Sequence, residues 1–379
     1  MKTKKFNPFL TSGYHSPAYF CAREAETEKI ISALQNGTNV SLISPRRIGK
    51  TGLIQHIFYR IKERDKNAFC FYIDIFSTQN LLEFTTTLGK AVIGKLESKP
   101  QFIMKRVAGF FKSFRPLFSF DAKTGMPTVS LDIQNEQAQN SLQEIFMYLK
   151  NSDKAVYLAI DEFQQITEYP EKGIEALLRS YMQFLPNVHF IFSGSKKHLM
   201  DAMFSSANRP FYQSTQKVNL KEIPIDSYRK FALSLFSKYK KKLPAEVFDF
   251  IYSSLQGHTW YVQFILNQLF ALNKTYYSIP DAKEAIYDVL QEESATYKTY
   301  CEIITKGQLN LLRAIAKEQN VKSPFEQSFM QKHGLKAVSS VKLALKSLID
   351  KTLILRDENG FYYVYDRFFS LWLRNFSNF

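Results

Sequence analysis

The residues best suited to phosphate chemistry stand together in one short stretch, Ser44 to Gly52, which reads SPRRIGKTG. It matches the phosphate-loop pattern G-x-x-x-x-G-K-[ST] at every fixed position but the first, where serine replaces glycine. Backbone N–H groups that wrap a phosphate need a close approach, which Gly49 allows because it has no Cβ. Lys50 can then reach the outer phosphates of a nucleotide, and Thr51 offers a hydroxyl to Mg²⁺.

The sequence on either side of this stretch predicts the strand and helix that such a loop requires. Residues 39–43 (NVSLI) form a short apolar run that favours a strand, and apolar residues recur at helical spacing over 53–58. A chance strand–Gly–Lys–Thr–helix junction is the alternative. The flanking pattern favours a genuine phosphate loop.

Two adjacent acids form a second group of candidate residues. Asp161 and Glu162 end the apolar run 155–160, which is typical of a buried strand. The first acid can hold the water shell of Mg²⁺, and the second is placed to orient and deprotonate an attacking water. Two acids at a strand end can also serve only to keep a loop solvated. The upstream phosphate loop favours the chemical interpretation.

A third group follows the next apolar run, residues 188–192. In a parallel sheet ligands bind beyond the carboxyl ends of the strands, so Ser193 or Ser195 is expected to face the γ-phosphate beside Lys50 and Glu162. A Ser-Gly-Ser turn is also common without any such role. His189 lies inside the predicted strand and is interpreted as a packed core histidine.

Composition limits the class of protein. The chain of 379 residues is long enough for two or three domains, and its net charge of +15 suits attraction to a polyanion or to nucleotide phosphates without identifying either. It contains no run of about 18 apolar residues and no apolar signal-peptide core. Three distant cysteines argue against a disulfide framework or a cysteine metal site, so a cytoplasmic setting is expected.

The order of predicted elements indicates an α/β fold. Strands alternate with helices over the first 200 residues, which predicts a parallel sheet flanked by helices. A long helix is expected over 81–114, followed by a hairpin insertion at about 115–133. This hairpin is equally consistent with a partner or interdomain contact and with an inert insertion. Pro116 and Pro127 place it at an edge or in a protruding ribbon rather than in the central sheet.

The second half of the chain is predicted to be helical and then winged. Helices over 226–239, 244–255, 260–271 and 279–296 form an all-α lid, in which Trp260 or Tyr261 either faces the adenine or, as we favour, packs in the core. Three helices and an Asn-Gly hairpin from about residue 306 indicate a winged helix. The expected domains are 1–222, 223–300 and 301–379.

The third helix of the winged-helix segment would be its recognition helix. It carries no Arg and no Asn or Gln pair for bidentate base contacts, which favours an interdomain or protein contact over direct DNA binding. The polar residues it is expected to expose are Lys336, Ser339, Ser340, Lys342 and Lys346.

Taken in order, these motifs resemble those of the archaeal and bacterial P-loop ATPases of the AAA-like, STAND-related family, often called the archaeal-type ATPase domain. The motifs are FCAREAE at 20–26, SPRRIGKTGL at 44–53, AIDEFQQI at 159–166, FSGS at 192–195, GHTWYVQ at 257–263 and the winged-helix end. The resemblance covers nearly the whole chain. The sequence departs from the family pattern at Ser44 and at Thr259, where the relatives usually carry glycine and proline.

The resemblance implies a set of roles for these residues. Mg²⁺ would be held through Thr51 and Asp161, Glu162 would activate water, and Ser195 or Ser193 would act as the sensor. Arg209 or Arg179 would meet the γ-phosphate, within the molecule or across a subunit interface. ATP would be bound by Ser44, Pro45, Arg46, Arg47, Ile48, Gly49, Lys50, Thr51 and Gly52.

The main hypothesis is therefore a Mg²⁺-dependent ATPase that binds ATP and ADP and acts as a nucleotide-controlled switch on a protein or nucleic-acid partner. The rival is a winged-helix DNA-binding regulator in which nucleotide plays little role. No membrane association is expected, and the sequence leaves the oligomeric state and the identity of the partner open.

Overall fold

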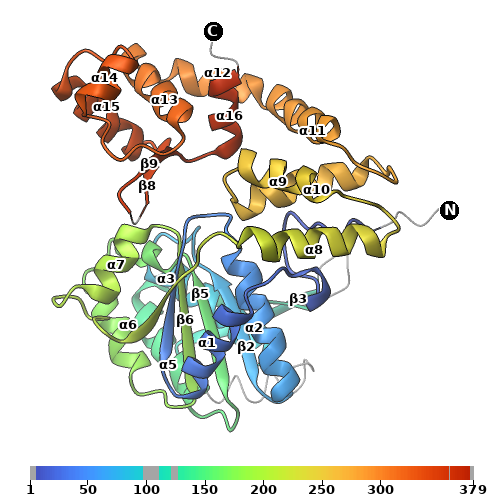
Figure 1. The fold of residues 1–379 in the computed structure, drawn as a ribbon. Helices are drawn as coiled ribbons and strands as arrows, with labels where there is room; N and C mark the ends of the chain where they lie inside the picture. The colour runs from blue at the N-terminus through green and yellow to red at the C-terminus, as the bar shows by residue number, and fades with distance from the viewer. Residues whose placement is uncertain (1–5, 97–110, 121–126, 358, 376–379) are drawn as a thin grey trace. The chain divides into compact units, whose positions relative to one another are not determined.

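A computed structural model describes residues 6–96, 111–120, 127–357 and 359–375. The chain divides into two compact units (Figure 1). Residues 13–221 form the first, here called the sheet unit. Residues up to Ser12, together with those from Glu222 onward, form the second, here called the helical unit.

The sheet unit is built on parallel strands in the order β2-β5-β6-β1-β7. Their bounds are β1 Asn39–Ile43, β2 Phe69–Asp74, β5 Val156–Asp161, β6 Val188–Gly194 and β7 Thr215–Asn219. In register, Ile43 lies opposite Gly194 and Asp74 lies opposite Asp161. The predicted α/β fold with a parallel sheet is confirmed, and the carboxyl ends of β1, β5 and β6 adjoin one another.

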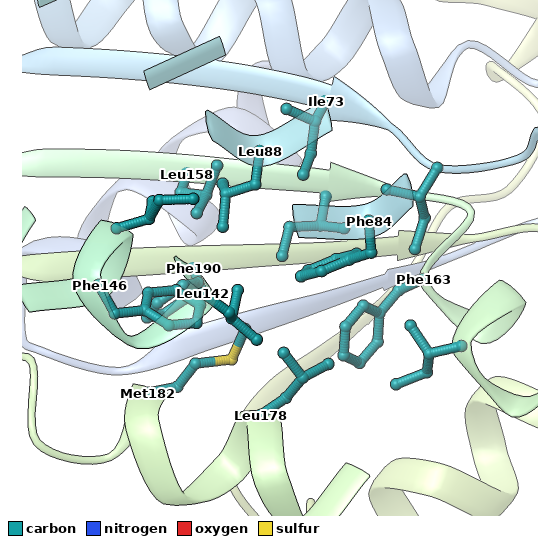
Figure 2. Close-up of a cluster of buried hydrophobic side chains, with 14 of the residues drawn as sticks. Ile73, Phe84, Leu88, Leu142, Phe146, Leu158, Phe163, Leu178, Met182 and Phe190 are labelled. Carbon is teal, nitrogen blue, oxygen red and sulfur yellow. The ribbon is translucent and has the colours of Figure 1, made fainter. Parts of the chain in front are cut away.

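Helices cover both faces of this sheet. Their bounds are α1 Glu24–Gln35, α2 Lys50–Arg64, α3 Leu81–Leu96, α5 Ala138–Lys150, α6 Ile174–Met182 and α7 Lys197–Ser205. Apolar residues of α1 and α2 pack with alternate residues of β1 and β5 on one face. On the other face, α3, α5 and α6 enclose a second cluster, which Figure 2 shows around Leu158 and Phe190. Apolar side chains on both faces explain the continuous apolar runs of the strands.

The predicted hairpin forms a separate antiparallel pair, β3 Phe114–Phe120 with β4 Pro127–Ile133. It lies outside the central sheet, as expected, and Leu131 and Ile133 join the buried cluster. A Cβ at Gly89 of α3 would stand 2.4 Å from Leu131 Cδ1, so glycine allows this close packing. The turn predicted at residues 121–125 lies outside the described residues.

The helix predicted over 81–114 was wrong at its end. Helix α3 runs from Leu81 to Leu96, and residues 97–110 lie outside the described residues. Residues 111–113 are not helical. The backbone N–H groups of Lys112 and Ser113 donate to the carboxylate of Glu144 instead of entering a helical ladder.

The helical unit follows the predicted order closely. Helices α8 Ile225–Lys238, α9 Ala245–Ser254 and α10 Thr259–Ala271 come first. The helix predicted over 279–296 is two helices, α11 Ile279–Glu292 and α12 Ser294–Glu302. The remaining elements are α13 Lys306–Glu318, α14 Gln327–Lys332, α15 Val338–Asp350, β8 Ile354–Arg356, β9 Tyr362–Val364 and α16 Arg367–Asn375.

The N-terminal arm, of which the structure describes residues 6–12, belongs to the helical unit. Phe9 is fully buried, with its ring centroid 5.0 Å from that of Phe236 and 5.9 Å from that of Phe270. The side chain of Asn267 on α10 donates from Nδ2 to the backbone oxygen of Phe9 at 2.6 Å. The backbone oxygen of Asn267 in turn accepts from Asn7 Nδ2 at 3.0 Å. The arm is thus anchored by an aromatic side chain and by paired amide contacts.

Candidate functional site

The loop between β1 and α2 has the backbone shape that the motif predicts. Ser44 is buried, and its N–H donates to Gly194 O at 3.3 Å, which extends the ladder between β1 and β6. Arg47 and Gly49 have φ values of +66° and +107°. Only glycine adopts the second value readily, and a Cβ there would meet nothing within 4 Å. The backbone at Gly49, just before α2, is therefore open on the side where a Cβ would stand.

Lys50 is buried inside this loop and is only 6% exposed. Its Nζ donates to Ser44 O at 3.1 Å and to Pro45 O at 3.2 Å, so the ammonium bridges the base of the loop. Burial lowers the pKa of Lys50, while the negative charges of Asp161 and Glu162 act in the opposite direction. The cation thus lies close enough to both acids to feel their charge.

Thr51 and Asp161 are brought into direct contact. Thr51 Oγ1 donates to Asp161 Oδ2 at 3.1 Å, and Tyr72 Oη donates to the same oxygen at 2.7 Å. Asp161 Oδ1 accepts from Glu162 N at 3.0 Å, and the side chain is almost fully buried. The hydroxyl and carboxylate predicted to share a metal ion therefore adjoin each other.

Glu162 lies beside the predicted sensor. Its Oε2 accepts from Ser195 Oγ at 2.6 Å and from Gln164 Nε2 at 2.6 Å. Its backbone has φ +55° and ψ +40°, an uncommon conformation for a residue with a Cβ. Of the two candidate serines, Ser195 meets Glu162, whereas Ser193 Oγ is buried without a hydrogen-bond partner among the described residues.

Arg209 is placed in an ion pair. Its Nε donates to Glu175 Oε2 at 3.0 Å, and its Nη2 contacts Glu175 Oε1. Arg179, the other candidate cation, lies one helical turn after Glu175 on α6. A contact of either arginine with the γ-phosphate stays a prediction, and for Arg209 it would require separation from Glu175.

The sequence analysis did not select several residues that surround the site. Tyr72 and Gln164 contact the two acids directly, and Asp74 lies opposite Asp161 in the strand register. Partial burial raises the pKa of Asp74, and the charges of Asp161 and Glu162 raise it further. Their position in the sequence could have indicated them, because Tyr72 and Asp74 lie at the carboxyl end of β2, the strand that neighbours β5.

The amino-terminal motif also reaches the loop. Arg23 is buried, with φ +81°, and its Nη2 contacts Ile48 O at 3.5 Å. Phe20 lies 3.5 Å from where a Cβ on Gly52 would stand. The FCAREAE segment therefore packs on the phosphate loop and on the first turn of α2.

These residues fit a nucleotide carrying Mg²⁺. The space around Gly49 can admit a phosphate, the buried ammonium of Lys50 supplies positive charge, and the Thr51–Asp161 pair presents the oxygen ligands that Mg²⁺ prefers. A hydroxyl and a carboxylate leave further coordination positions to phosphate oxygens and water, as is usual for this ion.

Two family models match most of the chain. Residues 20–265 match the model for an ATPase domain predominantly from Archaea. The chain belongs to this ATPase family. Residues 295–375 match a probable winged helix domain, as predicted. No curated protein sequence gives a significant match.

Solved structures share the fold over nearly their whole length. The Walker-type ATPase PABY2304 of Pyrococcus abyssi has a TM-score of 0.64 at 17% identity, covering 97% of this chain and 99% of its own. The ORC2 protein of Aeropyrum pernix, in ADPNP–ADP complexes, has a TM-score of 0.58 at 14% identity, covering 98% and 96%. The ORC1 protein of the same organism, in complex with DNA, has a TM-score of 0.52 at 11% identity, covering 96% and 94%.

Other predictions can be placed in the structure. Tyr261 is a core residue of the helical unit, and Trp260 Nε1 donates to Thr11 O at 3.0 Å, so both aromatics have partners within that unit. His189 is half-buried beside Tyr157, with ring centroids 5.0 Å apart. Across the described part of the chain, no helix has both the length and the hydropathy of a membrane span.

Proposed function

We propose that this member of the ATPase family is a Mg²⁺-dependent ATPase whose nucleotide state acts as a switch on a partner. The observation that carries the proposal is the convergence of Lys50, Thr51, Asp161 and Glu162 at the carboxyl ends of β1 and β5. A structural ion-pair network would not need the open loop around Gly49 beside these groups.

The loop would bind the phosphates of ATP. Backbone N–H groups near Arg47 and Gly49, at the positive end of α2, favour an anion. Lys50 Nζ would exchange the carbonyls of Ser44 and Pro45 for phosphate oxygens, and the ammonium would then oppose negative charge on the outer phosphates. Burial strengthens this interaction because little water screens it.

Thr51 and Asp161 would hold the metal ion. When bound, Mg²⁺ neutralises charge that develops on the phosphate oxygens. Tyr72 fixes the orientation of Asp161 by donating to Oδ2, and the N–H of Glu162 fixes Oδ1. The carboxylate is therefore oriented before any metal arrives.

Glu162 would act as the general base. It would accept a proton from water as the water oxygen bonds to the γ-phosphorus. The bond between that phosphorus and the oxygen bridging to ADP breaks, so the products are ADP and inorganic phosphate. Ser195 holds one oxygen of Glu162 at 2.6 Å and thereby positions the base.

Phosphate release and ATP binding test this proposal in the purified wild type, Lys50→Ala and Glu162→Gln. We expect Lys50→Ala to lose ATP binding, because the outer phosphates lose their buried cation. Glu162→Gln should bind ATP and turn over at least about tenfold more slowly. A wild type that does not bind ATP, or a Lys50→Ala variant that binds it normally, would refute the proposal.

The switch would act on a protein or DNA partner through the winged helix. Helix α15 exposes Lys342 and Lys346, and Leu343 between them is 71% exposed. An apolar residue flanked by lysines suits an acidic protein surface, while the lysines alone suit DNA phosphates. ATP and ADP would change the affinity for either partner by stabilising different states of the ATPase domain.

The second candidate function is DNA binding without nucleotide control, which the winged-helix match and the lysines of α15 support. A duplex titration over a range of salt concentrations separates the two. Phosphate contacts give an affinity that falls steeply with salt, and the double change Lys342→Glu and Lys346→Glu should flatten that slope. Affinity that differs between ATP and ADP favours the switch, and the absence of binding at low salt removes the DNA candidate.

A further inference from the structure

Glu162 is held by two donors on the same oxygen. Ser195 Oγ and Gln164 Nε2 each lie 2.6 Å from Glu162 Oε2. Glu162 Oε1 accepts no hydrogen bond within the described parts of the chain. Two donors on one oxygen fix the plane of a carboxylate and leave its second oxygen available, which is the arrangement that a base needs for a water molecule.

The side chain of Gln164 packs closely against Gly194, the last residue of β6. Gln164 is 2% exposed, and its backbone carbonyl accepts from Thr167 Oγ1 at 2.8 Å. A Cβ on Gly194 would stand 2.4 Å from Gln164 Oε1 and 2.5 Å from Met200 Sδ. Such distances are shorter than real Cβ contacts, so a larger residue at position 194 would force the Gln164 amide or the Met200 side chain to shift.

Burying the Gln164 amide at this position costs free energy of folding. Gln164 Oε1 is buried and has no hydrogen-bond partner in the described residues. An unsatisfied buried acceptor costs about 1–3 kcal/mol, and an apolar side chain of the same length would avoid that cost. Packing therefore does not explain the glutamine, whereas its hydrogen bond to Glu162 does.

We infer that Gln164 is a positioning residue for the general base: together with Ser195 it anchors Oε2 of Glu162, so that Oε1 faces the attacking water. This inference rests on the proposed ATPase function. Gln164 takes no proton itself. It sets the orientation in which Glu162 accepts the proton that water loses when its oxygen bonds to the γ-phosphorus.

The decisive variant is Gln164→Met, which keeps the length of the side chain and removes the donor. We expect kcat for ATP hydrolysis to fall about tenfold, with the KM and the Kd for ATP changing less than about twofold, because the lost interaction acts on the base rather than on the nucleotide. The melting temperature should not fall, since the unsatisfied Oε1 is removed as well.

Gln165→Met is the matched control. It makes the same chemical change one residue further on, where Nε2 donates to Thr78 O at 3.2 Å and not to Glu162. Its kcat should equal that of the wild type. A double variant, Glu162→Gln with Gln164→Met, supplies the second test. If Gln164 acts through Glu162, the double variant should be no slower than Glu162→Gln alone.

The outcomes separate this inference from the proposed function. The role of Gln164 would be overturned if Gln164→Met kept the wild-type kcat. It would also be overturned if the double variant were about tenfold slower than Glu162→Gln. Either result leaves the proposed function standing, provided that Glu162→Gln still shows its own loss of kcat. Wild-type turnover in Glu162→Gln would overturn the proposed function, and the inference with it. A drop in melting temperature that accounts for the lost activity of Gln164→Met would also count against the inference.

Discussion

Thr51 Oγ1 lies 3.1 Å from Asp161 Oδ2, although the two residues are 110 positions apart in the sequence. The contact joins the first turn of α2 to the carboxyl end of β5, which β6 separates from β1, the strand before the phosphate loop. Tyr72 on β2 donates to the same oxygen. Three elements thus place one hydroxyl and one carboxylate where a metal ion could be shared.

Asp161→Asn should remove the Mg²⁺-dependent part of ATP affinity. The change keeps the shape of the side chain and removes its charge, so affinity for ATP with Mg²⁺ should fall about tenfold or more. Affinity measured in a chelator should change little. Titration calorimetry with and without Mg²⁺ tests this, with Asp74→Asn as the control carboxylate at the neighbouring strand end. Equal Mg²⁺ dependence in Asp161→Asn and the wild type would contradict the metal role.

Much of the site could be predicted because its residues follow strand ends. Asp161 and Glu162 end one apolar run, and Lys50 and Thr51 follow the loop that comes after another. Parallel strands place the carboxyl ends of such runs at one edge of a sheet. The five-strand order required the structure, because apolar runs of similar length do not state which strands pair. Burial of these strands on both faces of the sheet could be predicted from their continuous apolar composition.

The missed contacts depend on side-chain directions rather than on motif spacing. Tyr72 reads as an apolar strand residue, and its hydroxyl contact becomes visible only when β2 is paired with β5 in register. Gln164 follows the acids in a 3-10 turn, whose side-chain directions a sequence pattern does not specify. The N-terminal arm has no periodicity, yet Phe9 is anchored by residues more than 200 positions away.

Gly49→Ala should lose both stability and nucleotide binding. The φ value of +107° is strained for any residue with a Cβ, so we expect a cost of about 1–3 kcal/mol even though the space around the residue is open. Gly94→Ala is the matched control: it lies in α3 with nothing within 4 Å of its Cβ and no positive φ, and it should be neutral or slightly stabilising. Thermal unfolding and ATP titration measure both effects. A Gly49→Ala variant that binds ATP normally would show that the loop does not need this conformation.

Phe9→Ala should destabilise the helical unit. The buried ring packs against Phe236 and Phe270, and truncation of such a side chain costs about 3–5 kcal/mol. Both tryptophans, Trp260 and Trp372, lie in this unit, so urea unfolding followed by tryptophan fluorescence reports on it selectively. Phe6→Ala, whose side chain is 43% exposed, should cost less than about 1 kcal/mol. Similar losses in the two variants would mean that Phe9 does not anchor the arm.

Asp281 should make the stability of the helical unit depend on pH in the acidic range. It closes a capping box at the start of α11, where its Oδ2 accepts from Ser278 N at 2.8 Å and from Ser278 Oγ at 2.7 Å, while Lys274 contacts its Oδ1. The hydrogen bond from Lys274, followed by those from Ser278, lowers the pKa of Asp281 to about 2.

A lowered pKa fixes the direction of the pH effect. The unfolded chain has an Asp pKa of about 3.9, so the ionised carboxylate stabilises the fold above about pH 4, and this stabilisation is lost as pH falls towards about 2. Asp281→Asn should cost about 1 kcal/mol of unfolding free energy at pH 7. Because protonated aspartate and asparagine are both neutral, the difference between variant and wild type should shrink below pH 4. Urea unfolding by tryptophan fluorescence at pH 7, 4 and 3 tests this, and a difference that stays constant with pH would refute the ionic part of the cap.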